Sequence, residues 1–232
     1  RRAGRGILDK QVQAVPADAG APEIETEGAA GKSPAQFPSA RVAWRGVILL
    51  TALYSLSLMD RQLITLIVTD IRADLGISDF QMGLLHGLAF ALFYVTFGLV
   101  FGWAVDRYPR RAIIFFGVIF WSLATAACGM ARNFNQFLIG RFAVGAGEAA
   151  LNPAAYSIIA DSFPKHRRAV ALSVFGSGSF LGGGLAVALG ALLISSIPAD
   201  GLTLPLLGHL RPWRIALIAV GATFVISSGD LD

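Results

Sequence analysis

A short charged segment between two long apolar runs constrains this chain more than any other feature. The runs are residues 81–105 and 112–130, and the segment that joins them reads GWAVDRYPRR, residues 102–111. Each run is long enough to cross a bilayer as a helix, because about 20 apolar residues suffice. A joint this short lets the two helices pair only as an antiparallel hairpin. The sequence therefore predicts a helical hairpin in a membrane, with a basic turn at one end.

The composition indicates the same class of protein. Hydrophobic residues make up 55% of the chain and charged residues 15%, whereas soluble domains have about 25% charged residues. The net charge of +4 does not indicate a nucleic-acid partner, because the basic residues lie at the ends of apolar runs and not on one polar face. The single cysteine, Cys128, excludes a disulfide within the chain. We expect no metal and no cofactor.

Six apolar spans are predicted to form an all-α membrane bundle. They cover residues 44–69, 80–105, 112–130, 136–160, 169–197 and 212–228. Residues 1–41 are rich in Ala, Pro, Gly and acids and have no apolar period, so we expect a disordered tail there. Residues 42–228 are expected to form the six-helix bundle.

The loops between the spans fall into two sets of unequal charge. One set holds eight basic residues, namely Arg41, Arg45, Arg107, Arg110, Arg111, Lys165, Arg167 and Arg168. The other set holds four, namely Arg72, Arg132, Arg211 and Arg214. Because basic loops stay on the cytoplasmic side, the eight-residue set and the N-terminal tail are predicted to be cytoplasmic.

Four charged residues lie inside the predicted membrane spans. Asp60 and Arg61 interrupt the first span, and Arg141 and Glu148 lie seven residues apart on one face of the fourth. Such residues are costly in a membrane and nearly always face a bundle interior or a watery cavity. They either neutralise one another and hold helices together, or form a site for protons or for a charged substrate. Burial and a neighbouring arginine shift the titration of a carboxyl in opposite directions, which favours the second interpretation.

Small residues are concentrated in the fourth and fifth spans. We expect them to let helices approach closely or to shape a cavity; the candidates are Gly145, Gly147, Gly178, Gly182 and Gly183. Asn152 and Pro153 follow Glu148, and the proline is predicted to kink the fourth span.

The charged segment resembles the signature loop of the major facilitator superfamily, G-x-x-x-D-R-x-G-R-R/K. The matching residues are Gly102, Asp106, Arg107, Arg110 and Arg111, whereas Pro109 stands where the pattern has glycine. The basic loop after the fourth span and Pro212-Trp213-Arg214 are also similar to that superfamily, so the likeness covers residues 45–228. It implies the N-terminal half of a twelve-helix transporter, which is not an enzyme.

Within the superfamily the chain resembles the spinster-like transporters. Met59-Asp60-Arg61 and the run from Arg141 through Glu148 to Pro153 carry this resemblance. It implies that Asp60 and Glu148 take part in proton coupling and that Arg61 and Arg141 are their charge partners or bind a substrate head group. The implied substrate is a lysolipid or another anionic amphiphile, moved across a membrane that we expect to be the bacterial inner membrane.

The resemblance also implies alternating access, in which two six-helix halves rock about a central site. The loop at residues 102–111 would control this motion, with Asp161 as the expected partner of Arg110. Because only six spans are present, we expect the C-terminal half to be missing and this chain to be a fragment. Its expected partners are membrane lipid, protons, a small-molecule or lysolipid substrate, and that missing half.

Two other functions remain open on the sequence. A major facilitator for a sugar acid, an organic anion or a drug would use the same arginines for an anionic group. A six-span intramembrane protease is a remote alternative, because residues 175–178 lack the first glycine of a G-x-S-G turn and the sixth span has no histidine.

Overall fold

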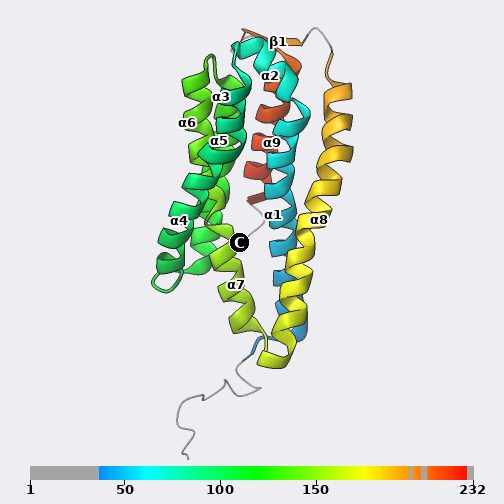
Figure 1. Cartoon of the computed structure of the whole chain (residues 1–232). Coiled ribbons are helices and arrows are strands. Elements are labelled where there is room, and N and C mark those ends of the chain that lie inside the picture. The colour runs from blue at the N-terminus through cyan, green and yellow to red at the C-terminus, as the bar shows by residue number, and fades with distance from the viewer. Residues whose placement is uncertain (1–36, 199–200, 205–207, 229–232) are drawn as a thin grey trace, which may run out of the picture.

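A bundle of long helices makes up the computed structural model of this chain (Figure 1), which describes residues 37–198, 201–204 and 208–228. The helices are α1 (Ala40–Leu66), α2 (Val68–Leu75), α3 (Asp79–Gly83), the π-helical turn η2 (Leu84–Leu88), α4 (Ala89–Val105), α5 (Arg110–Met130), α6 (Phe134–Glu148), α7 (Leu151–Ser162), α8 (Lys165–Ser196) and α9 (Pro212–Ser228). The bundle starts two residues earlier than the predicted boundary at 42. The predicted disordered tail lies almost entirely outside the described residues.

Four of the described helices are long and apolar enough to cross a membrane: Ala40–Leu66, Asp79–Val105, Arg110–Met130 and Lys165–Ser196. They correspond to the predicted first, second, third and fifth spans. The sixth span is the 17-residue helix α9. The fourth is divided into α6 and α7, which are 15 and 12 residues long. The six predicted spans are therefore all helical, although the fourth is not one helix.

The division of the fourth span follows from Pro153. A proline has no N–H to donate to the carbonyl four residues earlier, and its ring crowds that carbonyl. That carbonyl belongs to Ala149, where α6 has just ended, and the Ala150 N–H bonds to Gly147 at 3.2 Å in a tightened turn. The predicted kink is thus a two-residue interruption directly after Glu148.

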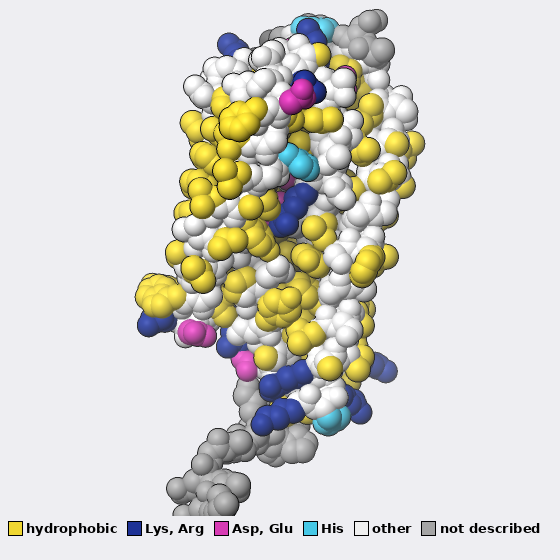
Figure 2. All heavy atoms as spheres, in the orientation of Figure 1, with side chains coloured by type: hydrophobic (Ala, Val, Ile, Leu, Met, Phe, Trp, Pro, Cys, Tyr) yellow, Lys and Arg dark blue, Asp and Glu magenta, His cyan; other side chains and the backbone are white. Residues whose placement is uncertain are grey.

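The six spans alternate in direction, so the connections between them gather at two ends of the bundle (Figure 1). We call the end that holds the start of α1, the α4–α5 turn and the α7–α8 turn the basic end; it is the lower end in Figure 2, where Lys and Arg side chains gather. At the opposite end a small antiparallel hairpin pairs β1 (Leu202–Leu204) with β2 (Gly208–Leu210). The sequence predicted only helices and a loop, so this hairpin corrects the all-α expectation locally.

The α4–α5 turn accepts Pro109 without strain. Pro109 precedes α5 with φ −58° and ψ 117°, and proline fixes φ near −65°. Positive φ values occur, among the described residues, only at Gly76 and Gly201. The turn therefore does not need the glycine that the signature pattern has at this position.

Glycines set how closely the helices pack. A Cβ at Gly182 would lie 2.5 Å from the Ser55 carbonyl oxygen, and one at Gly178 would lie 2.9 Å from that of Thr51, so α8 contacts the backbone of α1. The Ser55 hydroxyl also donates to the Gly178 carbonyl at 3.0 Å. Gly183, by contrast, meets open space. The interface of α1 and α8 thus depends on two of these three glycines.

The fourth span is tightly packed as well. A Cβ at Gly145 would lie 2.8 Å from the Phe90 carbonyl oxygen on α4, and one at Gly147 would lie 2.9 Å from the Trp121 nitrogen on α5. This close packing holds Arg141 and Glu148, on the same helix, at fixed positions inside the bundle.

Candidate functional site

The four membrane-embedded charges meet between α1 and α6 and pair crosswise. Arg61 of α1 pairs with Glu148 of α6, and Arg141 of α6 pairs with Asp60 of α1. The sequence placed the four residues on two helices; the structure brings them together as two ion pairs between those helices.

Glu148 is held by three donor atoms at one carboxylate oxygen. Its Oε2 accepts from Arg61 Nε at 2.7 Å and from the Ser57 hydroxyl at 2.9 Å, and Arg61 Nη2 lies 2.6 Å away. The Arg61 guanidinium lies over the rings of Phe90 and Tyr94, with Cζ 4.4 and 4.8 Å from their centroids. These contacts fix the guanidinium, and cation–π attraction is strongest where water is excluded.

Asp60 and Arg141 form a looser pair at a more deeply buried position. Arg141 Nη1 lies 3.7 Å from Asp60 Oδ2, which also accepts from the Thr125 hydroxyl of α5 at 3.3 Å. The Arg141 side chain is 2% exposed and that of Asp60 is 0% exposed, so both charges are almost fully removed from solvent.

Both pairs leave polar atoms unused. Among the residues that the structure describes, Asp60 Oδ1, Glu148 Oε1 and Arg141 Nε are buried and have no hydrogen-bond partner. Each such atom costs about 1–3 kcal/mol. An arrangement optimised only for stability would satisfy them, so these atoms mark the cluster as a candidate for chemistry.

A cavity of about 550 Å³ opens beside the cluster, in the hollow seen between α4 and α8 in Figure 2. Both arginines line it, together with apolar and aromatic groups and His86; the other lining residues are Leu58, Gln62, Gly87, Phe90, Ala91, Tyr94, Val95, Ser179 and Gly183. The two carboxylates do not line it. The cavity thus presents positive charge and apolar surface, with the acids behind the arginines.

Two residues beside the charge cluster carried no sufficient signal in the sequence. Ser57 and Thr125 contact the carboxylates, and the π-helical turn η2 places His86 at the cavity wall. The hydroxyls are common in membrane helices, so only the fold identifies these two. Asn152, which the sequence did single out, donates to the Tyr94 hydroxyl at 2.6 Å and links α7 to the cavity wall.

The signature loop lies at the basic end, far along the bundle from the charge cluster. Arg110 forms an ion pair with Asp161 at the end of α7, so the expected contact is present. Arg107 lies over the Trp103 ring with Cζ 4.1 Å from its centroid. Gly102, Asp106 and Arg111 are exposed at this turn. Whether these residues control a conformational change stays a prediction.

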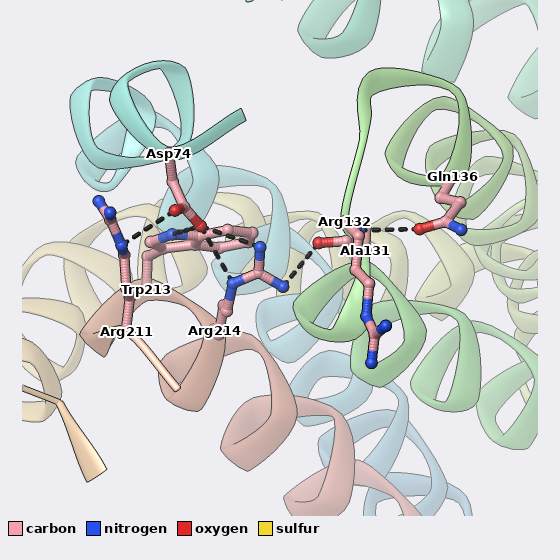
Figure 3. A network of polar contacts seen from close by, with 7 residues as sticks. All are labelled: Asp74, Ala131, Arg132, Gln136, Arg211, Trp213 and Arg214. Atoms are coloured by element: carbon pink, nitrogen blue, oxygen red, sulfur yellow. Dashed lines mark hydrogen bonds and ion pairs between the residues drawn. The ribbon is translucent and has the colours of Figure 1, made fainter. Parts of the chain in front are cut away.

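A second charge network, which the sequence did not predict, lies at the opposite end around Asp74 (Figure 3). Asp74 Oδ2 accepts from Trp213 Nε1 at 3.2 Å and from Arg214 Nε and Nη2 at 3.1 and 2.9 Å, and Oδ1 lies 2.9 Å from Arg211 Nε. Arg214 continues to the Ala131 carbonyl at 2.6 Å. The network thereby ties α2 to the start of α9 and to the α5–α6 loop.

Helices of membrane length packed into a bundle are the features of an integral membrane protein, and here a charged cavity lies along one side of that bundle. The Major Facilitator Superfamily matches residues 50–229, and the chain belongs to this superfamily, whose members are transporters and not enzymes. Within it the chain is spinster-like, as the sequence predicted.

The similar proteins include spinster homologues and other carriers. Protein spinster homolog 1 of Xenopus laevis is 36% identical over 66% of this chain and 30% of its own length. The sphingosine-1-phosphate transporter SPNS2 of Mus musculus is 34% identical, over 59% of this chain and 25% of its own. The probable L-galactonate transporter of Escherichia coli (strain K12) is 32% identical, over 61% of this chain and 31% of its own length.

A solved structure has the same fold. It is a crystal structure of a bacterial homolog of the human lysosomal transporter Spinster, inward-facing and occupied, with a TM-score of 0.77 and 32% identity. The match covers 84% of this chain and 44% of that one. This chain therefore spans less than half the length of these similar proteins.

Proposed function

We propose that this chain forms one half of a proton-coupled secondary transporter that moves a lysolipid or another anionic amphiphile by alternating access. A second six-helix bundle completes the cavity, because Arg61 and Arg141 line only one wall of it here. The cavity lies between the two halves, near the middle of the membrane, as in related transporter folds.

The observation that carries this proposal is that the positive side chains face the cavity and the negative side chains lie deeper in the bundle. Arg61 and Arg141 reach the cavity, and Glu148 and Asp60 lie behind them. An anionic head group entering the cavity meets the guanidinium that Glu148 already holds. A proton on Glu148 neutralises that carboxylate and leaves Arg61 available to the head group. Proton and anion binding are then coupled, and the coupling is reciprocal.

The rest of the cavity wall favours an amphiphile over a small polar anion. Leu58, Phe90, Ala91 and Val95 provide apolar surface beside the arginines, which suits an alkyl chain attached to an anionic group. SPNS2 carries a lipid phosphate by its name, which agrees with this chemistry. The similarity to an L-galactonate transporter keeps a sugar acid as the second candidate.

Proton flux in proteoliposomes tests the proposal, with the transporter that includes this chain. We expect lysophospholipid to drive proton movement, L-galactonate to drive none, and Asp60→Asn or Glu148→Gln to abolish the flux. Asp70→Asn, at an exposed carboxylate on α2, is the matched control and retains it.

Proton movement with L-galactonate and not with lysophospholipid would identify the substrate as a sugar acid and not a lipid. Full flux in both carboxylate variants would assign the cluster to helix packing. The 232-residue chain reconstituted by itself is expected to move no substrate, and efflux by it would contradict the need for a second half.

We further propose that the basic end is cytoplasmic and that the Arg110–Asp161 pair stabilises one of the two access states. Eight basic residues at this end and four at the other support the orientation. Lys165→Cys should react with an impermeant maleimide only from inside a bacterial cell, and Asp70→Cys only from outside. Asp161→Asn should shift the inward/outward balance in distance measurements between spin labels; an unchanged balance removes the gating role.

A further inference from the structure

An apolar groove of about 680 Å³ runs between α4 and α5 toward the basic end. Phe97 and Phe101 of α4 form one wall, and Phe116, Phe120 and Leu123 of α5 form the other. The three α5 side chains are 68%, 52% and 58% exposed. A solvent-exposed groove of this kind would be costly in water, so something apolar covers it in the membrane.

The groove lies on a different flank from the transport cavity. The residues that line the cavity come from α1, η2, α4, α6 and α8, and none comes from α5. Half of the residues that line the groove, in contrast, belong to α5. α4 and α6 line both, whereas α1 and α8 line only the cavity, so helices that complete the cavity beside α1 and α8 would leave the α5 side of the groove to membrane lipid.

The length of the groove fits one lipid chain. Pro109 at its end and Leu123 are 14 positions apart, which is about 21 Å along a helix axis. One leaflet contributes about half of a hydrocarbon core roughly 30 Å thick. The groove thus extends from the head-group region through the depth of one leaflet.

Positive charge lies at the mouth of the groove. Tyr108 and Pro109 close the groove there, and Arg107 and Arg111 flank them in sequence. Arg110 is engaged by Asp161, whereas Arg111 is exposed and, within the described part of the chain, has no hydrogen bond or ion pair. Clusters of basic residues beside membrane helices attract anionic head groups.

We propose that this groove is a binding site for an anionic phospholipid of the leaflet at the basic end. One acyl chain lies along Phe116 and Phe120, and the phosphate lies against Arg107 and Arg111. This lipid is not the transported substrate, since its site does not open into the cavity.

A photoreactive lipid tests the site in nanodiscs that hold the transporter including this chain. The probe is phosphatidylglycerol with a diazirine in its acyl chain, compared with phosphatidylcholine of the same chain. We expect phosphatidylglycerol to label the peptide with Phe116 and Phe120 about fivefold more strongly. Arg107→Gln combined with Arg111→Gln removes this preference. Arg167→Gln, at an exposed arginine at the start of α8, keeps it.

A second variant tests the groove itself without changing charge. Ala112→Trp fills the groove beside Pro109 and should reduce labelling by both lipids, whereas Ala169→Trp, at an exposed position on α8, should not. Equal labelling by the two lipids would overturn the head-group assignment. Crosslinking of the groove to another protein segment in place of lipid would overturn the site.

Discussion

Asp74 at one end of the bundle and Asp60 and Glu148 within it are all paired with arginine, but their oxygens are satisfied to different degrees. Both Asp74 oxygens meet donors, Oδ2 from Trp213 and Arg214 of α9 and Oδ1 from Arg211 directly before that helix. Asp60 and Glu148 use one oxygen each, and the other is buried without a partner in the described structure. In the Asp74 network both carboxylate oxygens have donors, whereas in the central cluster each carboxylate has one oxygen without a donor.

This difference separates a structural role from a chemical one. A carboxylate whose two oxygens both have donors gains little from a proton or a ligand. An unsatisfied buried carboxylate can accept a proton, and its arginine can be taken over by an anion. The comparison therefore predicts that damage to the Asp74 network affects stability, whereas damage to the central pairs also affects coupling.

The largest effect on stability is expected from Arg141→Leu. Asp60, which is 0% exposed, would keep a buried charge without its ion-pair partner, and breaking such a pair costs about 3–5 kcal/mol. Unfolding in detergent measures this loss. Arg141→Leu combined with Asp60→Leu should recover most of it, because no isolated charge then remains. A double variant as unstable as the single one would show that packing, not charge, decides.

Asp74→Ala is expected to cost about 2–3 kcal/mol, since it removes charged hydrogen bonds that join α2 to α9. Lysolipid-driven proton flux per folded molecule should stay unchanged, which distinguishes Asp74 from Glu148. Asp70→Ala, on the exposed side of α2, is the control and should change stability by less than about 0.5 kcal/mol. Loss of proton flux in Asp74→Ala would show that the Asp74 network and the central charge cluster act together in transport.

Gly182→Ala tests whether α1, which carries half of the central cluster, is positioned by α8. The added methyl would lie 2.5 Å from the Ser55 carbonyl oxygen, so we expect a loss of about 1–3 kcal/mol. Gly183→Ala is the adjacent control: it meets open space and should be neutral or slightly stabilising. Equal losses at the two positions would mean that the packing of α8 is not the cause.

The smallest effect is expected from Thr125→Val, which removes a 3.3 Å hydrogen bond to Asp60 while keeping the shape of the side chain. The expected loss is about 1 kcal/mol, measured by unfolding in detergent. Ser122→Ala, which removes a hydroxyl that donates to the Val118 carbonyl of its own helix, should cost less. A larger loss of stability in Ser122→Ala than in Thr125→Val would show that the Thr125 hydrogen bond to Asp60 does not stabilise the cluster.

Local patterns in the sequence were sufficient for the class of protein and for the positions of the helical spans, but not for the division of the fourth span into α6 and α7. Apolar length predicted the spans, and the loop at residues 102–111 predicted the superfamily, which the comparison confirmed. The pairing of Asp60 with Arg141 and of Arg61 with Glu148 was not predictable, because it depends on the height and rotation of α1 against α6.

Two other features were out of reach for similar reasons. Asp74 lies far in sequence from its partners, with separations of 139 and 140 residues to Trp213 and Arg214. Gly182 and Gly183 are adjacent glycines, yet Gly182 packs on α1 and Gly183 lines the cavity. Only the phase of α8 decides between these roles.

The crossed pairing also has an electrical consequence. Two carboxylates and two guanidiniums sum to zero, so a half that rocks with both pairs intact moves no net charge through the membrane field, where one elementary charge at 100 mV corresponds to about 2.3 kcal/mol. A monoanion that travels with one proton keeps this sum at zero. The cycle would then draw on the pH gradient and not on the voltage.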